Sequence, residues 1–127
     1  MCLTEHWLRK EESNYLAISG YENVSFYCRD GKSKGGSAIL VKNGVEFEKI
    51  SLQEWGNDLE FEISAVKVKN IIIFCIYRSP NSKVSEFLEK LKDCLKVFGK
   101  SKRLVICGDF NIDFKTDSIK KKVPKTN

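Results

Sequence analysis

The sequence predicts an α/β protein whose strands form layered sheets with mixed pairing. Two observations predict this class. Short apolar segments separated by turn residues fill the first part of the chain, as in a series of β-hairpins. A strongly amphipathic helix and one further short strand follow them, which is the order of an α/β sheet. With 127 residues, of which 42% are hydrophobic, the chain has room for one domain with a modest core.

The N-terminal elements are expected to be short. Residues 1–4 are apolar or β-tolerant and predict a strand that runs into Glu5. Residues 9–16 predict a helical turn that ends before Gly20. Residues 24–28 then predict the next strand.

Two strand pairs are predicted in the middle of the chain. Ser37–Lys42 predicts a strand that reverses at Asn43-Gly44, a dipeptide typical of hairpin turns, so residues 45–50 are its expected partner. Residues 61–68 and 71–77 predict the second pair. The latter segment is an unbroken apolar run, which indicates a strand covered on both faces.

The amphipathic helix has the clearest pattern in the sequence. Its apolar positions follow the i, i+3, i+4, i+7 spacing of a helix with one buried face: Val84, Phe87, Leu88, Leu91, Cys94, Leu95 and Phe98. Asn81 and Ser82 are candidates for its N-cap, and Gly99 is expected to end it. Residues 104–107 predict a last strand, which Gly108 ends just before Asp109.

Charge and composition say little about binding partners. The net charge is +5, but residues 115–127 contribute +4 through five lysines against one aspartate, so residues 1–114 carry only +1. We interpret residues 1–114 as the domain and residues 115–127 as a Lys-rich disordered tail, with a nuclear localisation signal as the alternative. No signal-peptide pattern and no apolar run near the ~20 residues of a membrane span are present. An intracellular protein, nuclear or cytoplasmic and not secreted, is therefore expected.

Polar side chains follow the predicted strands, where α/β sheets present their functional groups. Asp109 and Asn111 come directly after the last strand, and if the backbone stays extended both side chains leave on one face. The carboxylate could hold a hard cation or accept a proton from water, and the amide could orient a phosphate. A simple turn is the structural alternative for this pair.

Glu5, Tyr77 and Asn81 are the other candidates, because each lies at or just after the end of a strand. Their structural alternatives are a solvated strand terminus for Glu5, a core aromatic for Tyr77 and a helix cap for Asn81. His6, the only histidine, neighbours Glu5 and is expected to be a surface or turn residue.

Four segments, taken together, are more specific than any one of these signals. They are residues 2–8 (CLTEHWL), 35–41 (GGSAILV), 76–82 (IYRSPNS) and 108–113 (GDFNID). In their order and intervals they resemble the endonuclease/exonuclease/phosphatase superfamily, and within it the endonuclease domain of non-LTR retrotransposons. The resemblance covers nearly the whole chain up to Phe114, and it implies a mixed β-sheet sandwich flanked by helices.

The resemblance also implies an activity, a Mg²⁺-dependent hydrolysis of phosphodiesters in DNA, with Mn²⁺ able to substitute. Glu5 would bind the metal, and Asp109 would align or deprotonate the attacking water. Asn111 would position the phosphate and nucleophile, while Tyr77 would hydrogen-bond the phosphate or leaving group. Asn81 would help to bind the substrate strand. Neither a membrane nor a small organic cofactor is implied, and the oligomeric state is not predicted.

The same resemblance implies that the domain is incomplete at both ends. The family begins with a strand that bears a metal-site Asn, and it ends with a metal-site Asp and a Ser-Asp-His motif; this sequence shows neither part. We therefore expect an inactive fragment whose intact relatives nick DNA to prime reverse transcription. The alternatives are a non-catalytic remnant or interaction module of the same fold, and a phosphatase branch acting on phosphoinositides or sphingomyelin.

If the roles are right, Glu5, Tyr77, Asp109 and Asn111 should converge at one end of the sheets. Two carboxylates that share one hydrated Mg²⁺ should lie within roughly 8 Å of each other, because each oxygen contacts the ion directly or through one water.

The five cysteines generate a first testable prediction. They are odd in number, widely spaced and without a Cys-x-x-Cys pair, so we expect all of them to be reduced thiols: Cys2, Cys28, Cys75, Cys94 and Cys107. Thiol titration of the native protein, denatured without reductant, should find five free groups. A stable intrachain disulfide would contradict both this prediction and the intracellular location.

Overall fold

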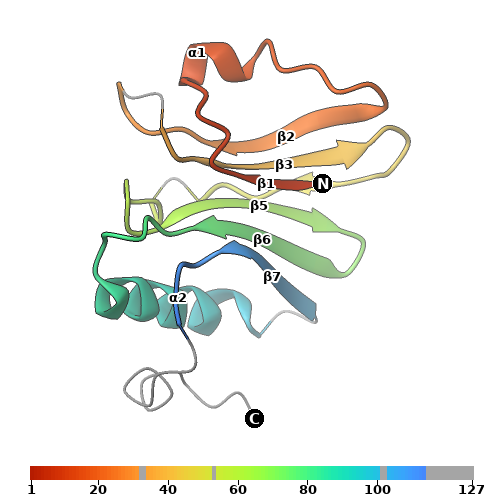
Figure 1. Ribbon diagram of the computed structural model, residues 1–127. Coiled ribbons are helices and arrows are strands. Elements are labelled where there is room, and N and C mark those ends of the chain that lie inside the picture. Colours follow the sequence, from red (N-terminus) through yellow and green to blue (C-terminus); the bar gives the residue numbers. More distant parts are fainter. Residues whose placement is uncertain (32–33, 53, 101–102, 114–127) are drawn as a thin grey trace.

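The computed structural model describes residues 1–113 except residues 32–33, 53 and 101–102. In this part of the chain two β-sheets pack face to face, and a long helix covers the outer face of the second sheet (Figure 1). The lysine-rich segment 115–127, predicted to be a disordered tail, lies outside the described residues.

The first sheet has three antiparallel strands in the order β1-β3-β2. Their bounds are β1 (Cys2–Thr4), β2 (Tyr21–Tyr27) and β3 (Ser37–Lys42), close to the predicted segments. Between β1 and β2 the chain makes the short helix α1 (Lys10–Ser13), within the predicted helical turn.

The second sheet has four strands in the order β4-β5-β6-β7. They are β4 (Glu48–Lys49), β5 (Glu62–Val68), β6 (Ile71–Tyr77) and β7 (Arg103–Asp109). The β4-β5 and β5-β6 pairs are antiparallel, and β6 pairs parallel with β7. Helix α2 (Val84–Phe98) makes the crossover that a parallel pair requires.

Strand β6 lies at the centre of the fold and is covered on both faces, as its unbroken apolar run predicts. Ile72, Phe74 and Ile76 belong to the core between the second sheet and α2. Ile73 and Cys75, which alternate with them, face the smaller core between the two sheets. Packing on both faces therefore holds the end of β6 rigidly and fixes the position of the residues that follow it.

One predicted pairing is wrong. Residues 45–50 are not the hairpin partner of β3, because β3 is the central strand of its sheet and already pairs with β1 and β2. The chain does turn at Asn43-Gly44, where the Val45 amide donates to the Lys42 carbonyl. It then crosses to the other sheet, where β4 pairs with β5.

The N-cap of α2 also differs from the prediction. The cap residue is Lys83, without a side-chain cap hydrogen bond, and not Asn81 or Ser82. Ser82 is engaged elsewhere, since its hydroxyl donates to the Ser79 carbonyl and accepts from Arg78. Gly99 ends the helix as predicted, with its amide donating to the Leu95 carbonyl at 2.8 Å.

The architecture confirms the predicted fold class, an α/β sandwich with mixed strand pairing and few helices. Among the residues described, neither helix has the length and apolar composition needed to cross a lipid bilayer.

We expect the substitution Phe87→Ala to destabilise the domain strongly. Phe87 is 1% exposed, and its ring centroid lies 5.7 Å from those of Phe61 and Phe110. Removing a buried phenyl ring lowers the free energy of unfolding by about 3–5 kcal/mol. On the same helix Val97 is 56% exposed, so Val97→Ala should change the stability by less than about 0.5 kcal/mol. Urea unfolding measures both; equal losses would show that α2 does not pack as described.

Candidate active site at the strand ends

A hydrogen bond between two distant residues joins the two sheets at the site. Tyr77 closes β6 and is buried, and its hydroxyl donates to Oε1 of Glu5 at 2.9 Å. Glu5 lies just past β1 and is exposed. Burial, and then the bond to the Glu5 carboxylate, raise the pKa of Tyr77 to about 12. The phenol is therefore a protonated donor throughout the neutral range.

The raised pKa also sets how this bond contributes to stability. Because the pKa of Tyr77 in the folded protein lies above its ordinary value of 10, the contribution is fully present below about pH 10. It is lost as the pH rises through about 12, where Tyr77 ionises beside Glu5.

The backbone holds Glu5 in an uncommon conformation. Its φ is 53°, and its amide donates to the Gly36 carbonyl at 2.9 Å. Gly36 itself has φ 94°, and a Cβ there would lie 2.3 Å from His6 Nε2 and 2.8 Å from the Tyr27 carbonyl oxygen. Only glycine fits this close approach. The Gly-Gly segment at residues 35–36 thus positions the strand end that carries Glu5.

His6 is a structural turn residue, as predicted. Its Nδ1 accepts from the Leu8 amide at 2.9 Å, so Nε2 carries the proton and donates to the Tyr27 carbonyl at 2.9 Å. The ring also lies 5.6 Å, between centroids, from that of Phe26. Both ring nitrogens are engaged in these hydrogen bonds, which leaves neither of them free to contact a phosphate.

A buried ion pair holds the Gly-Gly segment at residues 35–36 in place. Glu62 opens β5 and is fully buried, and its Oε2 lies 2.8 Å from Arg29 Nη2. Its Oε1 accepts from the Gly36 amide at 2.7 Å, and Oε2 also accepts from the Leu59 amide at 3.1 Å. The carboxylate is thus paired and fully hydrogen-bonded, which a buried charge requires. It connects the core to the backbone that positions Glu5.

Asp109 ends β7, two residues beyond the predicted end of this strand, and Asn111 follows in the next turn. In the parallel register of β6 and β7, Tyr77 pairs with Asp109. Gly108 allows this approach, since a Cβ there would lie 1.9 Å from the Ile76 carbonyl oxygen. Asp109 is exposed, and its Oδ1 accepts from the Asn111 amide at 3.3 Å.

The backbone does not stay extended through this pair, so the expectation that both side chains leave on one face is wrong. Asn111 has φ 49°, which turns the chain after Asp109. Its side-chain Nδ2 donates to the Arg78 carbonyl at 2.6 Å, and this bond orients the amide. Asp109 and Asn111 still lie together, but they are held by a turn and a hydrogen bond rather than by strand geometry.

Arg78 is a positioning residue that the sequence did not single out. It is 2% exposed, and its guanidinium donates to the Phe110 carbonyl at 2.7 Å and the Asn111 carbonyl at 2.5 Å. It also donates to the Ser82 carbonyl at 2.6 Å. Burial lowers the pKa of Arg78, an effect that the Asp109 charge opposes. One side chain thus fastens the turn after β7 to the start of α2.

The structure brings four of the predicted residues to one end of the sheets, Glu5, Tyr77, Asp109 and Asn111. Asn81 is exposed in the turn before α2 and takes part in none of the hydrogen bonds described above. The sequence did not identify Arg29, Glu62 or Arg78. For two of them the sequence holds one signal, a charged residue at the end of an apolar strand. Glu62 is the first residue of β5, and Arg78 directly follows β6.

The donors at this site fit a hard cation. Glu5 and Asp109 supply carboxylate oxygens from the two sheets, and Asn111 supplies an amide. Mg²⁺ is held in proteins by one or two carboxylates, with waters and substrate phosphates completing its coordination. The residues present therefore fit Mg²⁺ without a third acidic side chain.

Carboxylates, an amide and a phenol meet here at the strand ends of a two-sheet sandwich, an arrangement suited to phosphate esters. The chain matches the Endonuclease/Exonuclease/phosphatase family over residues 1–121 and belongs to that family. This confirms the resemblance at the level of the superfamily, whose members are of the phosphodiesterase and nuclease type. No curated protein matches the chain significantly.

Because of this buried network, we expect a nearly isosteric substitution at Glu62 to lower the free energy of unfolding strongly. Glu62→Gln leaves Arg29 buried without its counter-charge, and breaking a buried pair in this way costs about 3–5 kcal/mol. The matched control is Glu48→Gln, because Oε2 of Glu48 lies 3.8 Å from Lys67 Nζ at the surface. An exposed pair contributes about 0–1 kcal/mol. Chemical denaturation of both variants compares them, and similar losses would refute the role given to Glu62.

Proposed function

We propose that this chain carries the catalytic centre of a Mg²⁺-dependent DNA endonuclease similar to those of non-LTR retrotransposons. The observation that carries the proposal is the Tyr77 to Glu5 hydrogen bond, which joins the sheets at the position where Asp109 ends β7. Family membership supports phosphodiester hydrolysis in general. The metal, the DNA substrate and the retroelement branch are the parts that we propose.

Each residue has a role that its chemistry supports. Glu5 and Asp109 offer carboxylate oxygens to the cation, which when bound would stabilise charge on the phosphate. Asp109 also accepts hydrogen bonds in its exposed position and would align or deprotonate the attacking water. Asn111 would orient the phosphate and nucleophile through its amide. Tyr77, a neutral donor, would hydrogen-bond the phosphate or leaving group.

An exposed aromatic residue beside the site supports a nucleic-acid substrate over a phospholipid or inositol phosphate. Trp7, two residues after Glu5, is 54% exposed. Lys34 Nζ lies 5.7 Å from the centroid of its ring. An exposed ring can stack on a base, and a cation beside it can contact the backbone phosphates. Asn81, also exposed, would contact the same strand from the β6 side.

The 127-residue chain on its own is expected to nick DNA at or near the background rate. Its single histidine is held between the Leu8 amide and the Tyr27 carbonyl, so no imidazole of this chain can donate to the phosphate. Loss of one positioned donor costs about 10²–10³ in rate. A folded module without hydrolytic activity is therefore the second candidate for the chain alone.

The test uses Mg²⁺-dependent plasmid nicking by the chain alone and by a chimera. The chimera extends the chain at both ends with the corresponding segments of an intact family member. We expect the chimera to nick and the chain alone to remain near background. Asp109→Ala in the chimera should abolish nicking, because this residue orients the water.

The matched control in the chimera is Glu22→Ala, which removes an exposed acid at the opposite end of the first sheet, where Glu22 pairs with Val41. It should nick like the parent chimera. An active Asp109→Ala chimera would refute the role of Asp109, and robust metal-dependent nicking by the chain alone would refute the argument about its single histidine. A chimera that hydrolyses a phosphoinositide but not DNA would move the protein to the phosphatase branch.

A further inference from the structure

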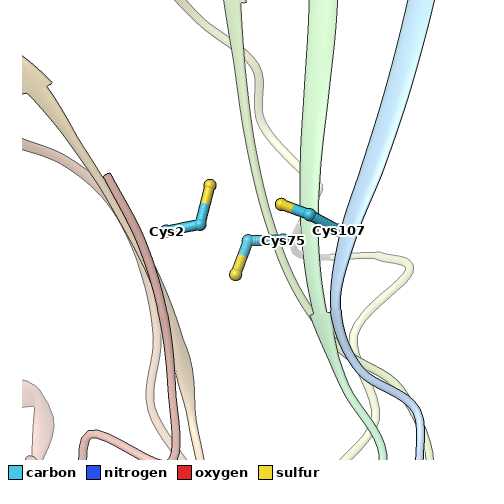
Figure 2. A group of neighbouring side chains, drawn as sticks. All are labelled: Cys2, Cys75 and Cys107. Atoms are coloured by element: carbon cyan, nitrogen blue, oxygen red, sulfur yellow. The ribbon is translucent and has the colours of Figure 1, made fainter.

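Three cysteines meet in the space between the two sheets, apart from the strand-end site. Cys2 lies on β1 of the first sheet, and Cys75 and Cys107 lie on β6 and β7 of the second. Figure 2 shows the three side chains projecting into this space, Cys2 from one sheet and Cys75 and Cys107 from the other. Their Sγ atoms all lie within 4.8 Å of one another. All five cysteines of the chain are free.

The fold itself brings these sulfurs together. Cys75 and Cys107 are partners in the parallel register of β6 and β7, so their side chains leave the sheet side by side. Cys2 comes from the opposite sheet, where it pairs with Ile39. Their wide separation in sequence explains why the cysteine spacing gave no sign of a site.

The surroundings favour a soft ligand over a hard one. The group contains only sulfur donors, and the core around it is apolar, with Ile39, Val66 and Ile73 among its members. Cys75 is fully buried, Cys107 is half-buried and Cys2 is exposed, so the triangle has one open side. Thiolates select Zn(II) and Cu(I) over the cations that oxygen donors prefer.

The dimensions suit one ion. Sulfurs that bind a single Zn²⁺ at about 2.3 Å lie roughly 3.8–4.0 Å apart, so the triangle needs to contract by no more than about 1 Å. In the free protein the thiols of Cys75 and Cys107 donate to the carbonyls of Leu3 and Phe74, at 3.4 and 3.3 Å.

We propose that Cys2, Cys75 and Cys107 form a three-thiolate site for a thiophilic d¹⁰ cation, Zn(II) or Cu(I). Binding is an exchange without oxidation or reduction, in which each S–H releases its proton to solvent and each sulfur forms a bond to the metal. Cu(I) is satisfied by the three sulfurs. Zn(II) takes a water as its fourth ligand, which the exposed side of Cys2 admits. The site uses none of the oxygen donors proposed for Mg²⁺.

The experiment uses the full chain, reduced with a phosphine and freed of metal. Co(II) is added as a spectroscopic probe, and sulfur-to-cobalt charge-transfer absorption reports thiolate ligation. Zn(II) then displaces the cobalt, and a separate titration with Cu(I) against a chromophoric chelator measures the other cation. We expect one ion to bind per chain. The preferred cation is the one that gives the larger increase in melting temperature.

Cys2→Ser is the test variant, because Cys2 is exposed and its replacement leaves the core intact. Its affinity should fall more than about 100-fold, since loss of even an outer-shell partner costs about 10–100-fold. Cys28→Ser removes a cysteine outside the cluster and should bind like the parent protein. Glu5→Gln should also bind normally, which separates this site from the proposed endonuclease centre.

Two results would overturn the proposal. One is equal binding by the Cys2→Ser and Cys28→Ser variants, which would place the metal elsewhere. The other is a folded, fully reduced protein with five titratable thiols that takes up neither cation, which would identify the cluster as ordinary core thiols.

Discussion

The buried pair of Arg29 and Glu62 is the contact on which the arrangement of the site depends. Arg29 follows β2 in one sheet and Glu62 opens β5 in the other, so their pairing fixes how the two sheets meet. The same carboxylate accepts from the Gly36 amide, and the Gly36 carbonyl accepts from the Glu5 amide. Burying both charges carries a desolvation cost that the pairing roughly offsets, so the benefit of the pair is geometric. Through these hydrogen bonds, the buried pair fixes the position of the exposed end of β1 that carries Glu5.

The sequence was most informative where one pattern decides the structure. The apolar run of β6 and the helical stripe of α2 both predict burial directly, and the structure agrees with them. The acids at strand ends were found because strand ends are where side chains leave the sheet. The partner of β4 was mispredicted, because a hairpin dipeptide describes a turn but not whether the preceding strand has a free edge. Glu62 and Arg78 were missed because charged residues are normally solvated, and only tertiary contacts show that these are not.

The sulfur cluster and the oxygen-donor site lie along the same face of the second sheet. Cys75 and Tyr77 are two residues apart on β6, and Cys107 and Asp109 are two apart on β7, so each pair shares a face. Along a strand, two residues span roughly 6.6 Å. The opposite sheet contributes Cys2 to one group and Glu5 to the other. Both sites therefore depend on the distance between the two sheets. A change in this distance at the sulfurs also alters the position of Tyr77 relative to Glu5.

The hydrogen bond between Tyr77 and Glu5 spans 72 residues of the chain, and this separation has a consequence for folding. Closing so long a loop carries an entropic cost that only the completed core repays. The β5-β6 hairpin and α2 involve near neighbours and can form earlier, whereas this contact requires β1 to dock on a finished second sheet. The proposed catalytic centre therefore exists only in molecules in which β1 has docked on the second sheet.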